Sequence, residues 1–106
     1  MKIGIIISTD DAETTWNALR FANFCLKQGD EARVFLMGRG VEYQRISTEK
    51  HDTVAQAEQF LQAKGRIFAC GTCIKSRNQK ESELCPLSTM KDMYDLVKES
   101  DRVVTF

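Results

Sequence analysis

Short, almost purely apolar runs alternate along this chain with longer segments in which apolar residues recur at helical spacing. The runs Ile3 to Ile7 and Val34 to Met37 have the pattern of strands that are covered on both faces, as in a parallel sheet. Shorter runs near residue 67 and at the end of the chain predict two more strands of this kind. The predicted parallel strands are Lys2–Ser8, Ala32–Met37, Arg66–Ala69 and Arg102–Phe106.

Two helices are predicted between the first three strands. The first spans about Glu13 to Gln28 and ends before Gly29, a residue type that often terminates helices. The second begins at Asp52-Thr53, which together with Gln56 resembles a capping box, and it ends at Gly65. The apolar positions that define one face of each helix are Ala18, Leu19, Ala22, Cys25 and Leu26 in the first and Val54, Ala57 and Leu61 in the second.

A last helix is predicted before the final strand. Thr89 and Asp92 form a Thr-x-x-Asp capping pattern, and the helix should end near Ser100. Its predicted apolar stripe consists of Met90, Met93, Tyr94 and Val97. Strands and helices therefore alternate along the whole chain. This order predicts an α/β fold, a three-layer αβα sandwich around a mainly parallel sheet, formed as a single domain by residues 1–106.

Composition narrows the classes of function. The 15 basic and 15 acidic side chains balance, so no electrostatic attraction to nucleic acid or to an anionic membrane is expected. Asp10 and Asp11 end the first apolar run too early for a signal peptide, and no segment reaches transmembrane length. We therefore expect a cytoplasmic protein. In that compartment its four cysteines are expected to be reduced, with catalytic or metal-binding roles rather than structural disulfides.

The carboxyl ends of parallel strands meet at one edge of a sheet, where ligands and reactive groups collect. Three loops are predicted at this edge, around Ser8 to Asp11, Gly38 to Gly40 and Cys70 to Cys73. The sequence has neither Gly-x-Gly-x-x-Gly after the first strand nor a Walker-type lysine motif. A dinucleotide or nucleoside triphosphate is therefore not predicted, and no cofactor is expected.

The segment Cys70-Gly71-Thr72-Cys73 places two thiols at a predicted corner between a strand and a helix. Gly71 ends the strand, and Thr72 is a cap or first-turn residue of the helix. Backbone N–H groups at a helix start favour the thiolate, which is the reactive form of cysteine. The spacing alone fits a redox dithiol, half of a metal site, a nucleophile with a helper, or two small buried residues.

The remaining candidates differ in their surroundings. Cys85 lies in a loop before a helix, where no periodicity predicts burial, and is expected to face the same edge as Cys70. Cys25 belongs to an apolar helix face and is predicted to be a core thiol, and His51 is predicted to be a surface residue. These side chains are the further ligands that a zinc site would need. No second Cys-x-x-Cys pair exists, however, so no metal is predicted.

Arg77 follows Cys70 by seven residues, and its guanidinium is a candidate for holding a thiolate or an anionic persulfide. The alternative is an exposed helix arginine. Trp16 and Tyr43 lie off the clearest helical stripes, which makes them candidates for a surface that binds another copy of the chain.

Three segments together resemble the DsrE-like (DsrE/DsrF-like) sulfur-relay family: residues 69–77, residues 85–90 and the closing Ser-Asp-Arg-Val-Val-Thr-Phe. The resemblance implies a short Rossmann-like domain in which Cys70, at the end of the third strand, carries sulfur as a persulfide. Arg77 matches the arginine of the family's Arg-Gly pair, and Asn78 replaces its glycine. It also implies sulfur donor and acceptor proteins as partners and homo-oligomers, often trimers or hexamers.

We therefore interpret the chain as a sulfur carrier or sulfurtransferase in which Cys70 accepts sulfane sulfur and a partner thiol removes it. Cys73 is the predicted resolving residue, which would release the sulfur by forming a disulfide. One alternative is a thiol redox or metal-binding module that uses Cys70 and Cys73. Another is an interaction protein that has the same fold and no activity.

Overall fold

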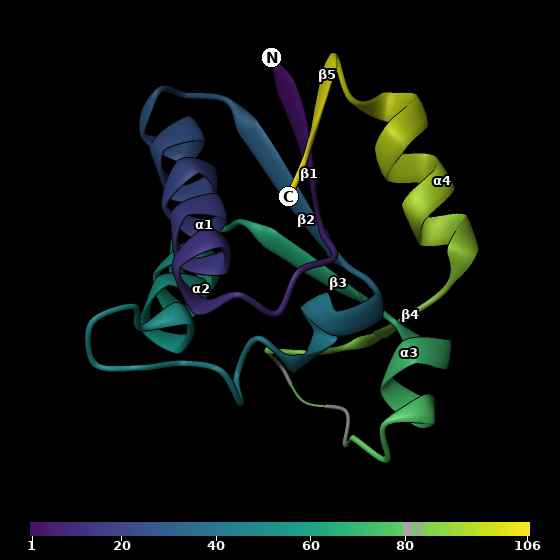
Figure 1. Ribbon diagram of the computed structural model, residues 1–106. Coiled ribbons are helices and arrows are strands. Elements are labelled where there is room, and N and C mark those ends of the chain that lie inside the picture. Colours follow the sequence, from purple (N-terminus) through teal and green to yellow (C-terminus); the bar gives the residue numbers. More distant parts are fainter. Residues whose placement is uncertain (80–81, 83) are drawn as a thin grey trace.

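The sheet observed in a computed structural model has five strands, each parallel to its neighbours, in the order β4-β3-β2-β1-β5 (Figure 1). The structure describes residues 1–79, 82 and 84–106. Parallel pairing confirms the prediction from the continuous apolar runs. The strands are β1 Lys2–Ile7, β2 Glu31–Leu36, β3 Arg66–Cys70, β4 Leu87–Ser88 and β5 Arg102–Thr105.

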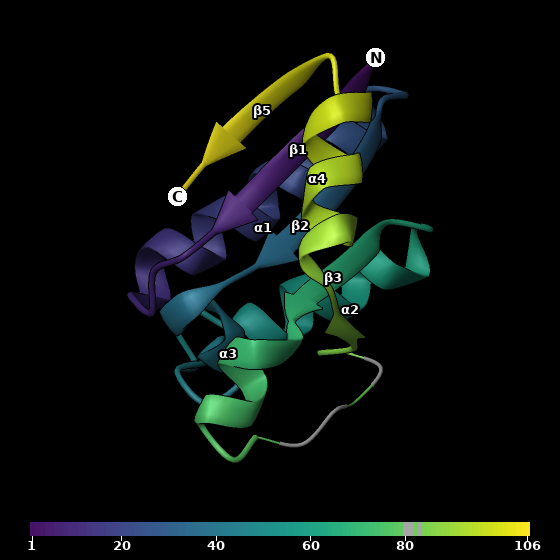
Figure 2. The same cartoon turned by 90° about the vertical axis from the view of Figure 1, so that its right-hand side faces the viewer.

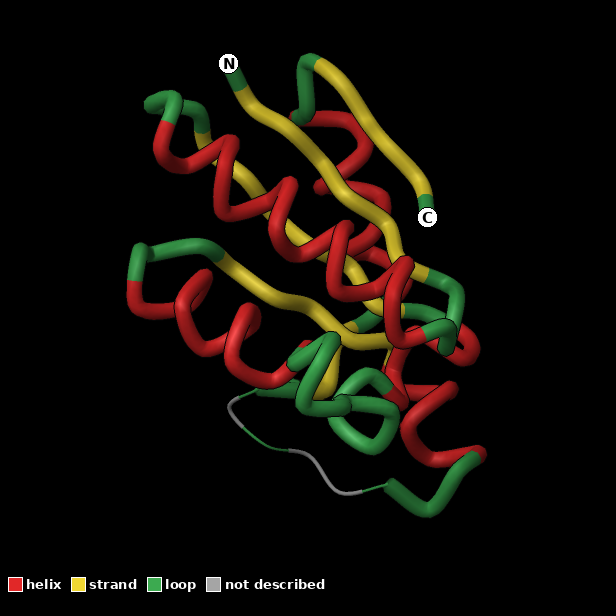
Figure 3. The backbone as a smooth tube through the Cα atoms, turned by 60° about the vertical axis from the view of Figure 1, so that its left-hand side comes forward, coloured by secondary structure: helices red, strands yellow, loops and turns green. Residues whose placement is uncertain are grey.

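Helices cover both faces of this sheet, so the predicted αβα layering is confirmed. Helices α1 (Ala12–Lys27) and α2 (Thr53–Gln62) lie on one face, and α4 (Met90–Glu99) lies alone on the other (Figures 1 and 2). The short helix α3 (Gly71–Ser76) follows β3 directly at the carboxyl ends of the strands. Figure 3 shows β5 next to β1 at the outer edge of the sheet.

The two faces of the sheet bury different amounts of apolar surface. Between the sheet and α1 and α2 lies a large core that includes Ile5, Val34 and Leu19. The face under α4 has a small core of three buried residues, Ile6, Phe35 and Leu96. Because apolar burial drives folding, α1 and α2 contribute more of the stability than the single helix on the opposite face.

Two segments differ from the prediction. The sequence analysis assigned no strand around Leu87, but this segment forms β4, which pairs with the end of β3 through Ala69↔Leu87 and Cys70↔Ser88. The connection after β2 contains a 3₁₀ helix, η1 (Gly38–Glu42). Tyr43, predicted as a surface residue for oligomerisation, is instead fully buried, and its hydroxyl donates to the carbonyl of Leu84.

The observed N-terminal caps of α2 and α4 agree largely with those predicted from the sequence. Asp52 caps α2 by accepting from the N–H of Ala55, although Gln56 bonds Asn23 rather than completing a capping box. Thr89 and Asp92 form the full capping box of α4.

The buried face of α4, in contrast, was predicted wrongly. Leu96 is the fully buried residue and Met93 is partly buried, whereas Met90, Tyr94 and Val97 are 67%, 61% and 45% exposed. A single helix on a sheet face buries only a narrow stripe, so much of this apolar set faces outward.

Candidate functional site

The strand β3 delivers Cys70 to the carboxyl edge of the sheet, meaning the edge at which the parallel strands end. Cys70 is the last residue of β3 and the residue before the first turn of α3, and it is partly exposed. Thr72 belongs to this first turn and does not cap the helix. Cys70 opens onto a hollow of about 340 Å³, whose other lining residues are Gly71, Thr72, Lys75, Leu87, Ser88, Thr89 and Met90.

The hollow beside Cys70 is bounded by three elements. On one side it is bounded by α3, and on the other by β4 and the first residues of α4. The side chain of Ser88 links β4 to β3, because its Oγ accepts a hydrogen bond of 3.2 Å from the N–H of Ala69. The lining of the hollow is largely apolar, and Lys75 is the one charged residue in it. Cys70 is therefore accessible from the surface formed by α3, β4 and the start of α4.

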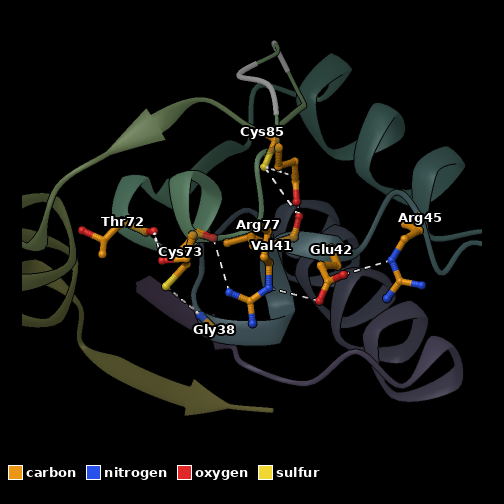
Figure 4. Close-up of polar contacts among 10 residues, drawn as sticks. Gly38, Val41, Glu42, Arg45, Thr72, Cys73, Arg77 and Cys85 are labelled. Carbon is orange, nitrogen blue, oxygen red and sulfur yellow. Dashed lines mark hydrogen bonds and ion pairs between the residues drawn. The ribbon is translucent and has the colours of Figure 1, made fainter.

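The second thiol, Cys73, is held by the neighbouring loop. Its Sγ accepts a hydrogen bond of 3.2 Å from the backbone N–H of Gly38, the first residue of η1 (Figure 4). Gly38 has a φ of +55°, a conformation that glycine adopts without strain. Burial, followed by hydrogen bonding with Cys70, raises the pKa of the Cys73 thiol. Cys73 therefore retains its proton at neutral pH, next to Cys70.

Arg77 contacts Cys73 rather than Cys70. Its Nη1 donates to the carbonyl oxygen of Cys73 over 3.3 Å, and its Nε donates to Oε2 of Glu42 over 3.1 Å (Figure 4). None of its hydrogen bonds within the described residues reaches Cys70. The expected contact between this guanidinium and the sulfur of Cys70 is therefore not found here.

The end of α3 explains how Arg77 reaches this position. Asn78 follows it with a φ of +51°, in the left-handed region that asparagine tolerates. The N–H of Gln79 bonds the carbonyl of Ile74, and the N–H of Asn78 bonds that of Lys75. These two bonds form a Schellman motif, which ends the helix. The asparagine thus serves the turn for which the family resemblance implied glycine.

Cys85 is not exposed at the carboxyl edge, and this part of the sequence analysis is wrong. The residue is fully buried, and its Sγ accepts a hydrogen bond of 3.3 Å from the amide of Gln79, which also donates to the carbonyl of Val41. Burial raises the pKa of the Cys85 thiol to about 11. The reason is that β4 pairs with β3 and draws the preceding residue into the core, where the thiol is neutral and inaccessible.

The other two candidates behave as predicted or nearly so. Cys25 lies in the large core, and burial raises its pKa. His51 is only partly exposed, because its ring packs against Trp16 at 5.1 Å between centroids and lies 3.5 Å from Glu13. Among residues 1–79, 82 and 84–106, no three His, Cys, Asp or Glu side chains are grouped so that they could hold a metal ion.

Of the three loops expected at the carboxyl edge, two contact each other through the thiol of Cys73. The loop after β2 contributes Gly38, and the corner after β3 contributes Cys73. The loop after β1 serves other purposes, since Asp11 caps α1 through Thr14 and Ser8 donates to the carbonyl of Phe106. Cys73 is therefore held between the loop after β2 and the corner after β3.

Two site residues were missed by the sequence analysis. Gly38 was assigned only to a loop, although the Gly-x-Gly after a buried strand signals a special backbone conformation there. For Glu42 the sequence carries no signal. Its partner Arg77 is 35 residues away, and only the folded chain brings the two together.

The described part of the chain has no helix that is long and apolar enough to cross a membrane.

The sequence model of the DsrE/DsrF-like family matches residues 1–106. Among curated relatives, an uncharacterized protein of Methanocaldococcus jannaschii is 34% identical over 114 residues and covers 100% of both chains. An uncharacterized protein of Methanopyrus kandleri is 34% identical over 100 residues, which cover 89% of this chain and 83% of the relative.

Solved structures show the same fold. The ychN protein from E. coli superposes with a TM-score of 0.83 at 20% identity, covering 100% of both chains. A conserved protein of unknown function from Bacteroides thetaiotaomicron gives a TM-score of 0.79 at 17% identity, covering 99% of this chain and 94% of the other. At these identities the agreement concerns the fold.

Proposed function

Since this chain belongs to the DsrE/DsrF-like family, which is associated with sulfur relay, we propose that it is a sulfur carrier or sulfurtransferase with Cys70 as the carrier. One observation carries this proposal. Cys70 is a partly exposed thiol at the carboxyl end of β3, open to a hollow and next to a second thiol that keeps its proton. The two other cysteines are buried.

The proposed reaction begins with a donor persulfide. The Cys70 thiolate attacks the outer, sulfane sulfur of the donor, the donor's S–S bond breaks, and the donor leaves as a thiolate. Cys70 then carries a persulfide. In the transfer step an acceptor thiolate attacks the terminal sulfur, and the Cys70 thiolate is the leaving group. Neither step needs a cofactor, because sulfur moves between thiols without a net change in oxidation level.

Cys73 has a different role in this scheme. Its retained proton can be donated to a negatively charged sulfur on Cys70, which stabilises the persulfide. If Cys73 loses that proton, its thiolate can attack Sγ of Cys70 and expel the terminal sulfur as hydrosulfide. The two cysteines are then oxidised to a disulfide and the sulfane sulfur is reduced. Cys73 therefore both protects the carried sulfur and provides a route for its release.

The direct test is sulfur loading of the reduced protein. We expect incubation with a small-molecule persulfide to add one sulfur atom, detected by intact-mass spectrometry and located on Cys70 by peptide mapping after alkylation. Formation of a Cys70–Cys73 disulfide with no sulfur adduct at any time point would instead favour a thiol redox module. Addition of sulfur at Cys25 or Cys85 only after unfolding would contradict carriage by the native fold.

We also propose that the protein acts as a homo-oligomer, a trimer or hexamer, in the cytoplasm, where its four free cysteines stay reduced, and exchanges sulfur with donor and acceptor proteins. The support for oligomerisation is the outward face of α4. Met90, Tyr94 and Val97 are exposed there, and Leu87 beside them is 42% exposed. Monomeric proteins rarely leave such a set of large apolar side chains in water.

This face gives a test of assembly. The double substitution Tyr94→Asp and Val97→Asp is expected to shift the protein to monomer, because two carboxylates would have to be buried without partners. Light scattering at micromolar concentration measures the change. The matched control is Phe24→Asp on α1, which is also exposed (58%) but lies on the opposite face of the sheet. A wild-type protein that is monomeric at these concentrations would overturn the proposal.

A further inference from the structure

Helix α3 and the loop after β2 are joined at the second thiol by contacts that span 35 residues of sequence. The N–H of Gly38, at the start of η1, donates to the sulfur of Cys73. At the other end of η1, the carboxylate of Glu42 accepts from Arg77, which itself donates to the carbonyl of Cys73. The side chain and the backbone of Cys73 are thus both tied to η1 (Figure 4).

We propose that Glu42 is a positioning residue for Cys73: by binding Arg77 it fixes the end of α3 and limits the positive charge that acts on the second thiol. Glu42 does not touch the sulfur and is not a catalytic residue. This inference rests on the proposed function only in assigning the release step to Cys73. The contacts themselves do not depend on that assignment.

The charges around Glu42 determine the direction of the effect. Its carboxylate forms ion pairs with two arginines, with the Nε of Arg77 at 3.1 Å and the Nε of Arg45 at 3.0 Å. Its hydrogen bond with Arg77 holds the pKa of Glu42 below its usual range, so the carboxylate is ionised at neutral pH. Glu42 therefore compensates the charge of Arg77 under the conditions in which the protein works.

The groups that act on Cys73 come from three elements. Cys70, at the end of β3, raises the pKa of Cys73 by hydrogen bonding, and the N–H of Gly38 in η1 lowers it. The positive charge of Arg77, at the end of α3, also lowers it. Neutralising Glu42 leaves Arg77 uncompensated and should lower the pKa of Cys73. Neutralising Arg77 should raise it.

This balance bears directly on how long sulfur stays on Cys70. Release as hydrosulfide needs the Cys73 thiolate, so a protonated Cys73 keeps the persulfide intact. By compensating the positive charge of Arg77, Glu42 slows premature release of hydrosulfide. A partner that displaced Glu42 from Arg77 would speed release, so the pair is a point at which docking and sulfur delivery are coupled.

The test measures the reactivity of Cys73 alone. In a Cys70→Ser background the remaining cysteines, Cys25 and Cys85, are buried, so the rate of native alkylation by iodoacetamide reports Cys73. We expect Glu42→Gln to raise this rate about threefold at pH 7 and Arg77→Gln to lower it about threefold, because the fraction of Cys73 present as thiolate rises in the first variant and falls in the second. The pH profiles should shift in the same two directions.

Arg45→Gln is the matched control, because this arginine binds the same carboxylate without contacting Cys73. It should change the rate by less than about twofold. Adding Glu42→Gln to Arg77→Gln should have little further effect, because Glu42 acts through Arg77.

The directions in which the two substitutions change the alkylation rate of Cys73 distinguish a charge effect from loosening of α3. Loosening exposes Cys73 in both variants, so both rates would rise, and that outcome overturns the proposal. Equal rates in all variants overturn it as well. Sulfur loading of Cys70 is measured separately in Glu42→Gln. Failure of wild-type loading would contradict the proposed function and leave the alkylation result standing, whereas normal loading with unchanged alkylation contradicts only the role of Glu42.

Discussion

Cys70→Ser is expected to abolish sulfur loading, reducing the adduct at least about a hundredfold, because a serine hydroxyl cannot replace the thiolate as nucleophile. The fold should survive the change. Cys70 is partly exposed at the end of a strand, and oxygen for sulfur leaves no large cavity, so the free energy of unfolding should change by less than about 1 kcal/mol. Intact-mass spectrometry after incubation with a small-molecule persulfide measures the adduct, and urea unfolding checks the fold.

Cys73→Ser is the matched control for this prediction. It should load sulfur as the wild type does but release no hydrosulfide, since no second thiol remains near Cys70. Cys70→Ser should therefore lose sulfur loading, whereas Cys73→Ser should lose only hydrosulfide release. If Cys70→Ser acquires sulfur normally, peptide mapping of the adduct identifies the true carrier, and the assignment to Cys70 is wrong.

The fold was predictable because the information that specifies it is local. Strands β1 and β2 are apolar runs that a doubly covered parallel sheet buries, and the caps at Asp52 and Thr89 act on residues within the same turn. The strand β4 was missed because two residues carry no periodicity. Its register comes from pairing with β3, which is a tertiary contact.

The site was predictable only in part, for the same reason. The position of Cys70 follows from the end of an apolar run, and the structure agrees with it. The burial of Cys85 does not follow from its neighbours, because it arises from Gln79, Val41 and the pairing of β4. Likewise, Arg77 was assigned to Cys70 from its spacing of seven residues, but α3 ends at Ser76 and the guanidinium binds Glu42.

The outward stripe of α4 illustrates a limit of helical periodicity. The pattern of Met90, Met93, Tyr94 and Val97 correctly predicts a helix, but periodicity identifies an apolar face without identifying what covers it. In this chain the sheet covers Leu96 and part of Met93. The rest of the stripe faces outward, and Met90 at its start lines the hollow of Cys70. The same pattern that predicts the helix therefore also marks the surface at which we propose assembly.

The loop after β2 should depend strongly on Gly40. A Cβ atom at this position would lie 2.1 Å from the carbonyl oxygen of Ile7 and 2.8 Å from its carbonyl carbon, both backbone atoms of β1. Neither can move without distorting the sheet, so Gly40→Ala should lower the free energy of unfolding by about 3 kcal/mol. Urea unfolding at neutral pH measures the loss. Because η1 also holds Cys73 through Gly38, the alkylation rate of Cys73 should rise in the same variant.

Gly29→Ala separates this steric effect from the general cost of replacing a glycine. Gly29 has a φ of +88°, and an added Cβ would meet nothing within 4 Å, so only backbone strain of about 1 kcal/mol is expected. This glycine lies at the opposite end of β2 from η1, and the alkylation of Cys73 should stay at the wild-type rate. Equal losses of stability in the two variants would mean that η1 does not pack against β1 in solution. The contacts that hold the second thiol would then lose their support.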